Sequence, residues 1–408
     1  MKKQIKHFCR ICKNKNLSSI LELGNHPISH RLLLKKDQKE YTHPINLVYC
    51  DKCGLIQLIN PIPPDELYSE YNWLSSWKPN PQIPELLSLI KGMDKLKKSS
   101  KIIEIGSNDG SFLNELKKLG YENLLGIEPS MDGYQSAIKN GIETIHDYFS
   151  EDVATSILKK QGQCDLIICR HVLEHIQDID ILSKGLSILL QHGSYILFEV
   201  PDADFILNQM DYSQIWEEHT NYFTLKTLSY FFSHIGIQQT YSGSAQFSGQ
   251  SLIFTGKKGK SSRVAKPELT DQHKEILAFK TFWPHFKIAI HKYLQEFKKK
   301  GKKIALYGAG CRACSLLNFT DIAKYLDFIV DDQLEKLNLF LPGSKLPVFS
   351  SKKLLSDSID ICFLAVNSEN NDKVIKNHQN YLDNGGIFIP ILPKSKHLPS
   401  FWQNPSKD

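Results

Sequence analysis

The sequence predicts an α/β fold in three modules: a small cysteine-rich module followed by two doubly wound parallel sheets. Apolar runs of four to six residues alternate with amphipathic stretches from Lys101, and the same alternation begins again at Lys302. Strands that are buried on both faces have this pattern, and their alternation with helices is typical of parallel sheets. Four of the nine cysteines lie within the first 53 residues, which marks a separate N-terminal module. We therefore expect modules at 1–80, 81–258 and 259–408.

The composition is that of an ordinary globular protein. Of 408 residues, 41% are hydrophobic, and 50 Lys and Arg stand against 44 Asp and Glu, a net charge of +6. This balance is too weak to indicate a nucleic-acid partner. No apolar stretch approaches the roughly 18–20 residues of a membrane-spanning helix. The basic N-terminus continues into paired cysteines and shows no signal peptide, so we expect a cytoplasmic protein without disulfides. The sequence leaves monomer and homodimer equally open.

Two C-x-x-C pairs, with 37 residues between them, predict a metal site. Each pair sits on a tight turn that brings two thiolates together, and four thiolates in a tetrahedron suit Zn²⁺ while leaving no open position for chemistry. The module is too small to fold on its core alone, so the metal would supply much of its stability. Buried free cysteines and a redox pair are the alternatives. The predicted ligands of one structural zinc are Cys9, Cys12, Cys50 and Cys53.

The first α/β block contains a loop with two glycines, between a strand that ends at Glu104 and a helix that begins near Ser111. Gly106 and Gly110 let the backbone approach a ligand, and the helix start offers free N–H groups. The loop lacks the G-x-G-x-x-G of dinucleotide sites, and Glu128 ends the next strand, where a carboxylate can accept both hydroxyls of a ribose. This E-x-G-x-x-x-G pattern resembles the S-adenosylmethionine site of class I methyltransferases, and a glycine turn with a surface acid is the alternative. The predicted cofactor contacts are Glu104, Gly106, Ser107, Asn108, Asp109, Gly110, Glu128, Arg170 and His171.

Arg170 and His171 end a later strand, at the edge where open parallel sheets bind ligands. His171 and His175 are four residues apart in H-V-L-E-H, so a helix would place them on one face. A zinc-protease site does not fit, because the glutamate directly precedes the second histidine instead of following the first.

A polar and aromatic segment, QMDYSQIWEEHTNYFTLKTL, follows the next strand. Its residues Glu217, Glu218, His219, Tyr222 and Phe223 are predicted to form a cluster that holds a histidine near neutral pKa and presents it to a substrate. Each of these residues alone is more often structural, so the prediction rests on their combination.

Together these motifs resemble the family of C-methyltransferases that act on nucleotide-linked ketosugars, over essentially the whole chain. That family joins an N-terminal Cys₄ zinc module, a central class I S-adenosylmethionine domain and a C-terminal Rossmann-like domain. The resemblance implies a methyltransferase of deoxysugar biosynthesis whose partner is a small-molecule nucleotide sugar. The matching motifs are Cys9-x-x-Cys12, Cys50-x-x-Cys53, EIGSNDG at 104–110, RHVLEHI at 170–176, Glu218-His219 followed by Tyr222-Phe223, and YGAGCRACSLLNF with VDD and LPGSKLPV near 307–348.

The resemblance also implies catalytic roles. In that family the histidine of the Glu-His pair is the base that removes a proton beside a keto group, and the matching residue is His219, with Glu218 beside it. His175 matches a second active-site histidine, which would donate to the enolate. Tyr222 completes the predicted catalytic set.

Two departures from the family pattern concern the substrate. Trp216 stands two positions before Glu218, where relatives can carry tyrosine, and the family's H-G-G turn is replaced by Ser248-Gly249-Gln250. They leave open which sugar is methylated and whether the acceptor atom is carbon. In the family, the region that matches LYSEYNW supplies an active-site tyrosine. Tyr71 is one of several rings in this stretch that could correspond to it.

The second α/β block carries Gly308-x-Gly310-x-x-Ala313 after a strand, with Asp331 and Asp332 21 and 22 residues beyond Gly310. Alone, this is a dinucleotide-binding fingerprint and predicts the main alternative function, an NAD(P)-dependent oxidoreductase or epimerase. However, the block ends near residue 395. This leaves few strands for the second nucleotide-binding half and no separate substrate domain, which weighs against an oxidoreductase. A helix from about Lys274 to Lys300 is expected to lead the block.

The family resemblance instead makes this block a degenerate Rossmann domain that closes over the active site and binds substrate phosphates through the N–H groups after Gly310. Cys311 and Cys314 form a third C-x-x-C, predicted to pack at a helix start, with a redox pair as the alternative. A non-catalytic binding protein is the third class of function, but a scaffold would need neither the cofactor nor the catalytic motifs. The predicted substrate contacts are Tyr71, Trp216, Gly308, Gly310, Arg312 and Asn318.

Overall fold

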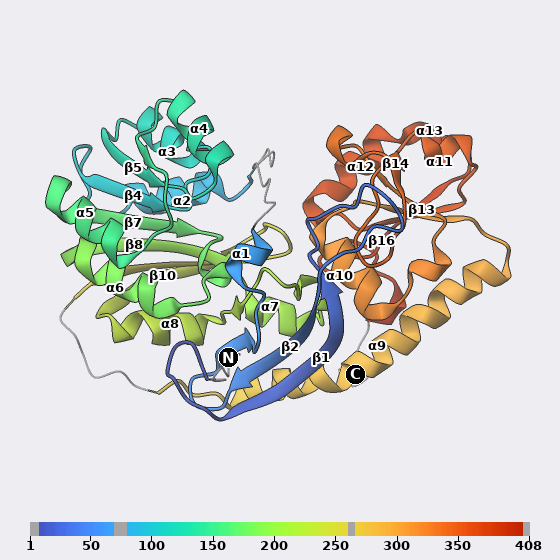
Figure 1. Cartoon of the computed structure of the whole chain (residues 1–408), viewed down its shortest axis with the longest axis horizontal. Coiled ribbons are helices and arrows are strands. Elements are labelled where there is room, and N and C mark those ends of the chain that lie inside the picture. The colour runs from blue at the N-terminus through green and yellow to red at the C-terminus, as the bar shows by residue number, and fades with distance from the viewer. Residues whose placement is uncertain (1–7, 69–79, 260–265, 403–408) are drawn as a thin grey trace.

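Three sheets organise the fold, in line with the predicted three-part α/β architecture (Figure 1). The computed structural model describes residues 8–68, 80–259 and 266–402. The N-terminal sheet is antiparallel, and its fourth strand comes from the middle of the chain. The N-terminal module and the segment around residue 221 therefore share one sheet. In spatial order its strands are β1 (Leu17–Pro27), β2 (Thr42–Cys50), β3 (Ile56–Leu58) and β9 (Asn221–Tyr222).

The central sheet has seven strands in the order β10-β11-β8-β7-β4-β5-β6. Its five strands from β4 to β8 are parallel, and all but the two-residue strand β6 lie at the predicted apolar runs. Strands β10 and β11 form an antiparallel edge that was not predicted. Ile103 pairs with Leu125 on one side and Ile167 on the other, and all three are buried. The strands are β4 (Lys101–Ile105), β5 (Asn123–Ile127), β6 (Thr144–Ile145), β7 (Cys164–Arg170), β8 (Leu190–Pro201), β10 (Ile237–Ala245) and β11 (Ser251–Lys258).

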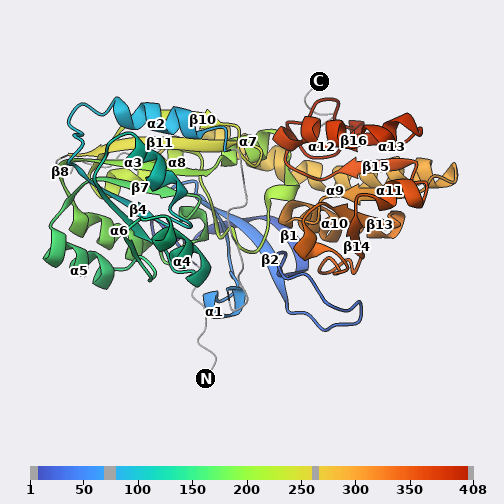
Figure 2. The ribbon, with the colours of Figure 1, turned by 90° about the horizontal axis from the view of Figure 1, so that it is seen from above.

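Helices connect these strands and cover the sheet (Figure 2). Ser130 and Ser150 cap two of them, each accepting a hydrogen bond from a backbone N–H of the first turn. Acidic residues in the first turn of α5 and lysines in its last turn complement the helix dipole. The helices of this domain are α2 (Ile83–Lys91), α3 (Ser111–Lys118), α4 (Met131–Lys139), α5 (Glu151–Gln161), α6 (Ile179–Leu189), α7 (Ala203–Asn208) and α8 (Leu225–His234), with α1 (Pro64–Leu67) before them and the single turns η1 (Leu173–His175) and η2 (Tyr212–Gln214).

The C-terminal domain is a second parallel sheet, in the order β14-β13-β12-β15-β16, as predicted. It follows α9 (Thr270–Lys299), which begins four residues before the predicted helix. Its strands are β12 (Ile304–Tyr307), β13 (Phe328–Asp331), β14 (Val348–Ser350), β15 (Ile361–Leu364) and β16 (Ile387–Pro390). Its helices are α10 (Cys311–Thr320), α11 (Lys353–Ser356), α12 (Asn371–Asn377) and α13 (Gln379–Asp383), with the single turns η3 (Ala323–Tyr325), η4 (Leu334–Lys336), η5 (Ser368–Asn370) and η6 (Ser400–Trp402).

Helix α9 and the β1–β2 ribbon run along both larger domains (Figure 1). Phe279 and Phe286 of α9 are fully buried and pack around Tyr212, whose hydroxyl donates to the carbonyl oxygen of Phe279 at 2.8 Å. One hydrophobic core therefore joins the N-terminal sheet, the segment before residue 217 and the C-terminal sheet.

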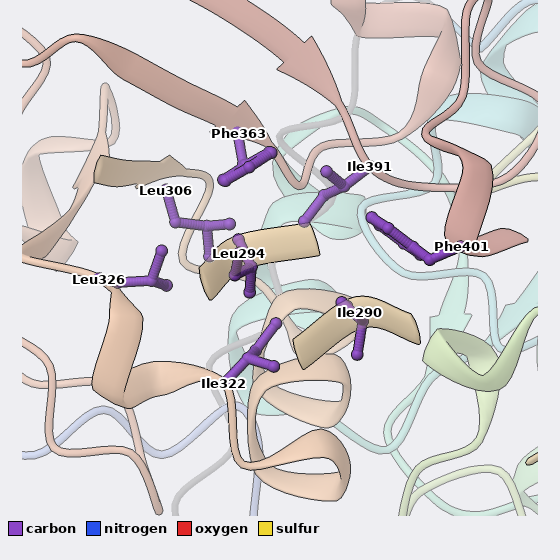
Figure 3. A pocket seen from close by; sticks show the side chains of 8 residues that line it. All are labelled: Ile290, Leu294, Leu306, Ile322, Leu326, Phe363, Ile391 and Phe401. Atoms are coloured by element: carbon purple, nitrogen blue, oxygen red, sulfur yellow. The ribbon is translucent and has the colours of Figure 1, made fainter. Parts of the chain in front are cut away.

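A small apolar cavity lies between α9 and the C-terminal sheet (Figure 3). Its volume is about 10 Å³, no more than one water molecule would occupy, and no polar side chain lines it. It is a packing defect and does not resemble a ligand site. The side chains around it are Ile290, Leu294, Leu306, Ile322, Leu326, Phe363, Ile391 and Phe401. Within the described ranges, no helix is both long and apolar enough to cross a membrane.

Candidate functional site

The structure brings the four cysteines of the two C-x-x-C pairs together. Sγ of Cys9 is 3.4 Å from that of Cys53, Sγ of Cys12 is 3.5 Å from that of Cys50, and all four lie within 4.8 Å of one another. The second pair sits on a turn in which the Gly54 N–H donates to the Cys50 carbonyl at 2.8 Å, and the φ of +78° at this position favours glycine.

This arrangement suits a tetrahedral zinc ion. Zn–S bonds of about 2.3 Å would place the sulfur atoms of a tetrahedron about 3.8 Å apart, close to the observed separations. Cys9, Cys50 and Cys53 are fully buried and Cys12 is half-buried, so the site is closed. These four residues are the ones that could hold a structural metal.

At the carboxyl end of β4, the chain turns through Gly106 and Gly110, which have φ values of +70° and +73°. A Cβ at Gly106 would lie 2.3 Å from Cγ2 of Val172, so the loop packs directly against the segment that follows β7. Asp109 accepts the Ser111 N–H at 3.0 Å and caps the start of α3. The loop conformation therefore depends on glycine at both positions.

Glu128 fixes the same loop from the end of β5. Its Oε2 accepts the Asn108 N–H at 2.8 Å, while its Oε1 accepts the Ser130 N–H at 2.8 Å and the Ser130 hydroxyl at 2.6 Å. The carboxylate is held in one orientation beside the loop. Ser107 lies within the loop, and its hydroxyl is buried with no hydrogen-bond partner among the described residues.

Glu104 is the buried acid of this site, with 2% of its surface exposed. Its Oε1 is 3.8 Å from Nη1 of Arg170, and its Oε2 has no hydrogen-bond partner within the described part of the chain. Burial outweighs the charge of Arg170 and raises the pKa of Glu104 to about 8. A buried carboxyl oxygen without a partner suits a cationic group of a ligand.

Arg170 and His171 both turn towards buried protein carboxylates. Nε of Arg170 is 3.0 Å from Oε2 of Glu199, and Nε2 of His171 is 3.2 Å from Oε1 of the same side chain. Burial alone would lower the pKa of His171, but the charges of Glu199 and Glu174 outweigh it and raise the pKa to about 9. The two cations are thus neutralised within the protein, and their predicted contact with a cofactor stays a prediction.

His219 is buried between two other rings. Its ring centroid is 4.0 Å from that of Trp216 and 5.0 Å from that of His175. Its Nδ1 is buried and has no hydrogen-bond partner among the residues that the structure describes. Burial, reinforced by the charges of His175 and His171, holds the pKa of His219 well below the usual 6.5. The imidazole is therefore neutral at pH 7 and can accept a proton.

The tautomer of His175 is set by the backbone. Its Nδ1 lies 3.0 Å from the carbonyl oxygen of Glu218, so Nδ1 must carry the proton and Nε2 lies on the opposite side of the ring. One nitrogen of each of His175 and His219 and one oxygen of Glu174 lie within 4.8 Å of one another. Two predicted catalytic histidines are thus neighbours in the structure.

The two glutamates before His219 have partners from the N-terminal module. Ser29 donates to both oxygens of Glu217, from its backbone N–H at 2.6 Å and its hydroxyl at 3.0 Å. Nδ1 of His30 is 2.6 Å from Oε1 of Glu218. Burial raises the pKa of Glu217, but the nearby His26 outweighs it and lowers the pKa. Ser29 and His30 were not predicted as partners, because a contact across 188 residues leaves no local sequence pattern.

Tyr222 lies on β9 next to this cluster. Its hydroxyl accepts the Trp216 N–H at 3.2 Å, and its ring centroid is 6.2 Å from that of His219. The phenol therefore supports the backbone before the Glu-His pair. A direct catalytic contact of Tyr222 stays a prediction.

Tyr71, the predicted substrate-contacting ring, lies outside the described residues. Tyr68 belongs to the same LYSEYNW stretch and is described. Burial, followed by the charge of Glu218, raises the pKa of the Tyr68 phenol well above 10, which places this ring beside the acidic cluster. Among the described residues of this stretch, Tyr68 is a ring that the charge of Glu218 affects, and the contact of Tyr71 with substrate stays a prediction.

In the C-terminal domain, the predicted substrate residues have protein partners. Arg312 is 5% exposed, and its guanidinium bonds to three groups: Asp211 at 2.6 Å, the Ser213 hydroxyl at 3.1 Å and the Asn367 amide oxygen at 3.2 Å. The Asn318 amide donates to a backbone carbonyl at residue 342 at 3.1 Å. These contacts join α10 to η2 and hold a nearby turn.

The turn before α10 is shaped by two glycines. Gly308 has a φ of +109°, and a Cβ there would lie 3.0 Å from the carbonyl oxygen of Ala365, whereas a Cβ at Gly310 would meet open space. Asp331, one of the two acids of the dinucleotide-type pattern, accepts the Ala309 N–H at 2.8 Å. The dinucleotide-type loop therefore already uses this carboxylate within the protein.

Cys311 and Cys314 start α10. Burial raises the pKa of both thiols above the usual 9, so neither is a thiolate at neutral pH. This favours the packing role predicted for them over a redox pair.

The departure at Ser248-Gly249-Gln250 lies where the two large domains meet. The Ser248 N–H donates to Oε1 of Glu369 at 3.0 Å, and the Gln214 amide donates to the Ser248 carbonyl at 2.8 Å. Gly249 has a φ of +101°, and a Cβ there would lie 2.4 Å from the Gln214 amide nitrogen. The turn therefore connects the central and C-terminal domains.

Three family models match successive parts of the chain. A model described as "Putative zinc binding domain" matches residues 9–68, one described as "Methyltransferase domain" matches 81–240, and one described as "C-methyltransferase C-terminal domain" matches 261–393. These matches follow the three sheets in order.

Individual proteins also resemble the chain. It is 25% identical to the C-methyltransferase NovU of Streptomyces niveus over 404 residues, which cover 95% of this chain and 96% of that protein. It is 26% identical to a ubiquinone biosynthesis O-methyltransferase of Escherichia coli O139:H28 over 101 residues, 24% of this chain and 41% of that protein. Among solved structures, a SAM-dependent methyltransferase from Archaeoglobus fulgidus aligns with a TM-score of 0.35 and 16% identity, covering 43% of this chain and 92% of that chain.

Proposed function

The chain belongs to the C-methyltransferase family and is an S-adenosylmethionine-dependent methyltransferase, and from this premise we propose that it methylates a carbon beside the ketone of a nucleotide-linked sugar. The observation that carries the proposal is the contact between the buried His219 and the half-buried His175, which lies three residues after Val172, the residue packed against the glycine loop of β4. The sugar class rests on the motif resemblance, and the reaction rests on the chemistry of the two histidines.

His219 is the proposed base. A carbon can attack a methyl donor only after its α-proton has left, so the site needs a neutral base in contact with the sugar. The lowered pKa keeps the His219 imidazole unprotonated at neutral pH. The C–H bond breaks, its proton moves to the imidazole, and its electron pair forms the enolate.

His175 is the proposed partner of the enolate oxygen. With Nδ1 bound to the Glu218 carbonyl, only Nε2 can face a ligand, and in the protonated ring Nε2–H donates to the developing oxyanion. Trp216 lies against His219, where its ring excludes water from the base. These assignments give each of the two histidines a separate task.

The loop at 104–110 and Glu128 are the proposed cofactor residues. Bound S-adenosylmethionine supplies an electrophilic methyl group on a sulfonium, which the enolate carbon accepts as the S–C bond breaks. Oε2 of Glu104 would bind the cofactor's ammonium group, and the carboxylate of Glu128 lies at the end of β5, where a ribose is held in this class of sheet. Arg170 and His171 hold Glu104 and Glu199 in place beneath the loop.

An NAD(P)-dependent oxidoreductase is the rival function, and two features weigh against it. The central loop lacks the dinucleotide fingerprint, and the C-terminal sheet has five strands in the described residues, too few for a second nucleotide-binding half. Calorimetric titration with S-adenosylmethionine, S-adenosylhomocysteine and NADH separates the two functions. We expect the first two to bind and NADH not to bind; binding of NADH alone would contradict the proposal.

The direct test of His219 uses solvent exchange. Parent enzyme, incubated in D₂O with S-adenosylhomocysteine and a panel of TDP-, GDP- and CDP-linked 4-ketosugars, should introduce deuterium beside the ketone of the true substrate. His219→Asn should bind S-adenosylhomocysteine normally and lose exchange by about 10²-fold or more. An unchanged rate of exchange in this variant would rule out His219 as the base.

We also propose that Cys9, Cys12, Cys50 and Cys53 bind one structural zinc. Metal analysis by mass spectrometry should give one zinc per chain in the parent protein and none in Cys50→Ser. Loss of the metal should lower the free energy of unfolding by about 3 kcal/mol or more. Cys314→Ser is the matched control, a buried cysteine outside the quartet that should retain the zinc. Full zinc content in Cys50→Ser would refute the assignment.

A further inference from the structure

The N-terminal module contacts the segment 217–222 at several points on both sides of His219. Before His219, the turn at Ser29 and His30 binds the carboxylates of Glu217 and Glu218. These bonds join residues that lie 188 positions apart in the chain. The turn thus fixes the two residues directly before the proposed base.

Arg10 fixes the residue directly after it. Arg10 lies in the first C-x-x-C turn and is 8% exposed. Its Nη1 donates to the carbonyl oxygen of Thr220 at 3.0 Å, and its Nη2 donates to that of Leu58 at 2.8 Å. One guanidinium therefore ties the backbone beyond His219 to the end of β3.

The sheet continues this attachment. Tyr222 on β9 pairs with Ile56 on β3, which makes the end of the segment a strand of the N-terminal sheet. The central domain also holds the segment, through the Thr220 N–H to the Glu174 carbonyl at 2.8 Å, the Asn221 amide to the Ile176 carbonyl at 2.7 Å and the His175 ring to the Glu218 carbonyl. The path of the chain through His219 thus depends on two domains.

Burial makes these partners necessary. Glu217 and Glu218 are 0% and 3% exposed, and a buried carboxylate without a partner is strongly destabilised. Removing the His30 side chain would leave one Glu218 oxygen without its hydrogen-bond donor. The segment would then move to rehydrate that carboxylate, and the adjacent residue would move with it.

We propose that the N-terminal module positions the base, with Arg10 and His30 as the positioning residues on either side of His219. The inference rests on the proposed role of His219 and adds to it a second domain whose geometry the reaction needs. The loop at 104–110 is attached instead to β4 and β5, so loss of these contacts should leave cofactor binding intact.

The first experiment compares variants of His30 in the full-length protein. His30→Leu removes the donor, whereas the amide nitrogen of His30→Asn lies close to the position of Nδ1 and restores it. We expect kcat for deuterium exchange to fall about 10- to 100-fold in His30→Leu, because a base displaced by about 1 Å loses activity on that scale, and to recover largely in His30→Asn. The KM for the ketosugar and the affinity for S-adenosylhomocysteine should both stay within about twofold of the parent.

The second measurement needs no sugar substrate. In protein with ¹⁵N-labelled histidine, the imidazole signals of His219 are identified by their loss in His219→Asn. They should shift in His30→Leu and return in His30→Asn. His43→Leu is the matched control, since His43 bonds to Asn60 within the module and should leave the His219 signals unchanged.

Arg10→Lys provides a second route if His30→Leu does not fold. Lysine keeps the charge but cannot reach the Leu58 and Thr220 carbonyls together, so it should shift the His219 signals and lower exchange in the same direction. Unshifted signals in both variants, with exchange at the parent level, would overturn the proposal. If His219→Asn retains exchange but the His219 signals of His30→Leu still shift, His219 is not the base. The N-terminal module would then still position His219, so the two proposals fail separately.

Discussion

The imidazole rings of His175 and His219 meet edge to face, with centroids 5.0 Å apart and planes at 79°. The two rings share one buried site but differ in their partners. Nδ1 of His175 donates to the Glu218 carbonyl, while Nδ1 of His219 has no hydrogen-bond partner among the described residues. This asymmetry suits one ring to donate a hydrogen bond and the other to accept a proton.

Variants of His175 should separate its two nitrogens. The amide of His175→Gln lies near the position of Nε2 and can still donate to an enolate, whereas the amide of His175→Asn lies near Nδ1 and preserves only the bond to Glu218. We expect deuterium exchange to fall about 10²-fold in His175→Asn and clearly less in His175→Gln. Rates are measured with saturating S-adenosylhomocysteine and the exchanging ketosugar. The reverse order would mean that His175 acts only through the Glu218 backbone.

The pH profile of exchange should reflect the lowered pKa of His219. A base works when unprotonated, so a pKa well below 6.5 moves the acid limb of the profile to lower pH. At saturating ligands, we expect the acid-side fall of kcat for exchange to begin only below pH 6.5. A midpoint at or above 6.5 would contradict the buried, neutral state of the ring. Circular dichroism at each pH controls for unfolding.

Cofactor binding should release a proton from Glu104. Its pKa of about 8 means that the carboxyl is mostly protonated at pH 7, while the cofactor's ammonium group favours the ionised form. Calorimetry of S-adenosylmethionine binding at pH 7, in buffers of different ionisation enthalpy, should therefore show release of close to one proton. Affinity should rise by up to about tenfold per pH unit between pH 6 and 7.

Glu104→Gln should abolish this proton release and weaken binding. The matched control is Glu115→Gln on α3, since Glu115 is partly exposed and forms an ion pair with Lys118 on the same helix. That variant should bind and release a proton as the parent does. Equal proton release in parent and Glu104→Gln would assign the titrating group elsewhere.

The sequence was most informative where local pattern determines structure. The parallel strands of both large domains were predictable because strands buried on two faces are continuous apolar runs, and the glycine loop was predictable because Gly106 and Gly110 need positive φ. The edge strand β10 was not, because most of its residues are exposed or half-buried and carry no apolar run. The two-residue strand β9 is too short for any periodicity.

The partners of charged side chains were harder to predict than the charged residues themselves. Arg170 and Arg312 are placed at ligand-binding edges by their position in the chain, but sequence does not tell whether a guanidinium turns to a ligand or to the protein. In the structure they face Glu199 and Asp211, which lie 29 and 101 residues away. The bond between His30 and Glu218 was invisible for the same reason.

The ion pair of Arg312 and Asp211 should be a major link between the central and C-terminal domains. Its side chains are 6% and 0% exposed, so Arg312→Ala would leave a buried carboxylate unpaired, and we expect the free energy of unfolding to fall by about 3–5 kcal/mol. Adding Asp211→Asn should recover part of this loss, because the amide carries no charge. Lys302→Ala, which breaks a partly exposed pair with Asp360, should cost about 1 kcal/mol or less. Chemical denaturation measures all four proteins. A loss of 1 kcal/mol or less in Arg312→Ala, with a raised KM for the ketosugar, would instead support the substrate contact predicted from the sequence.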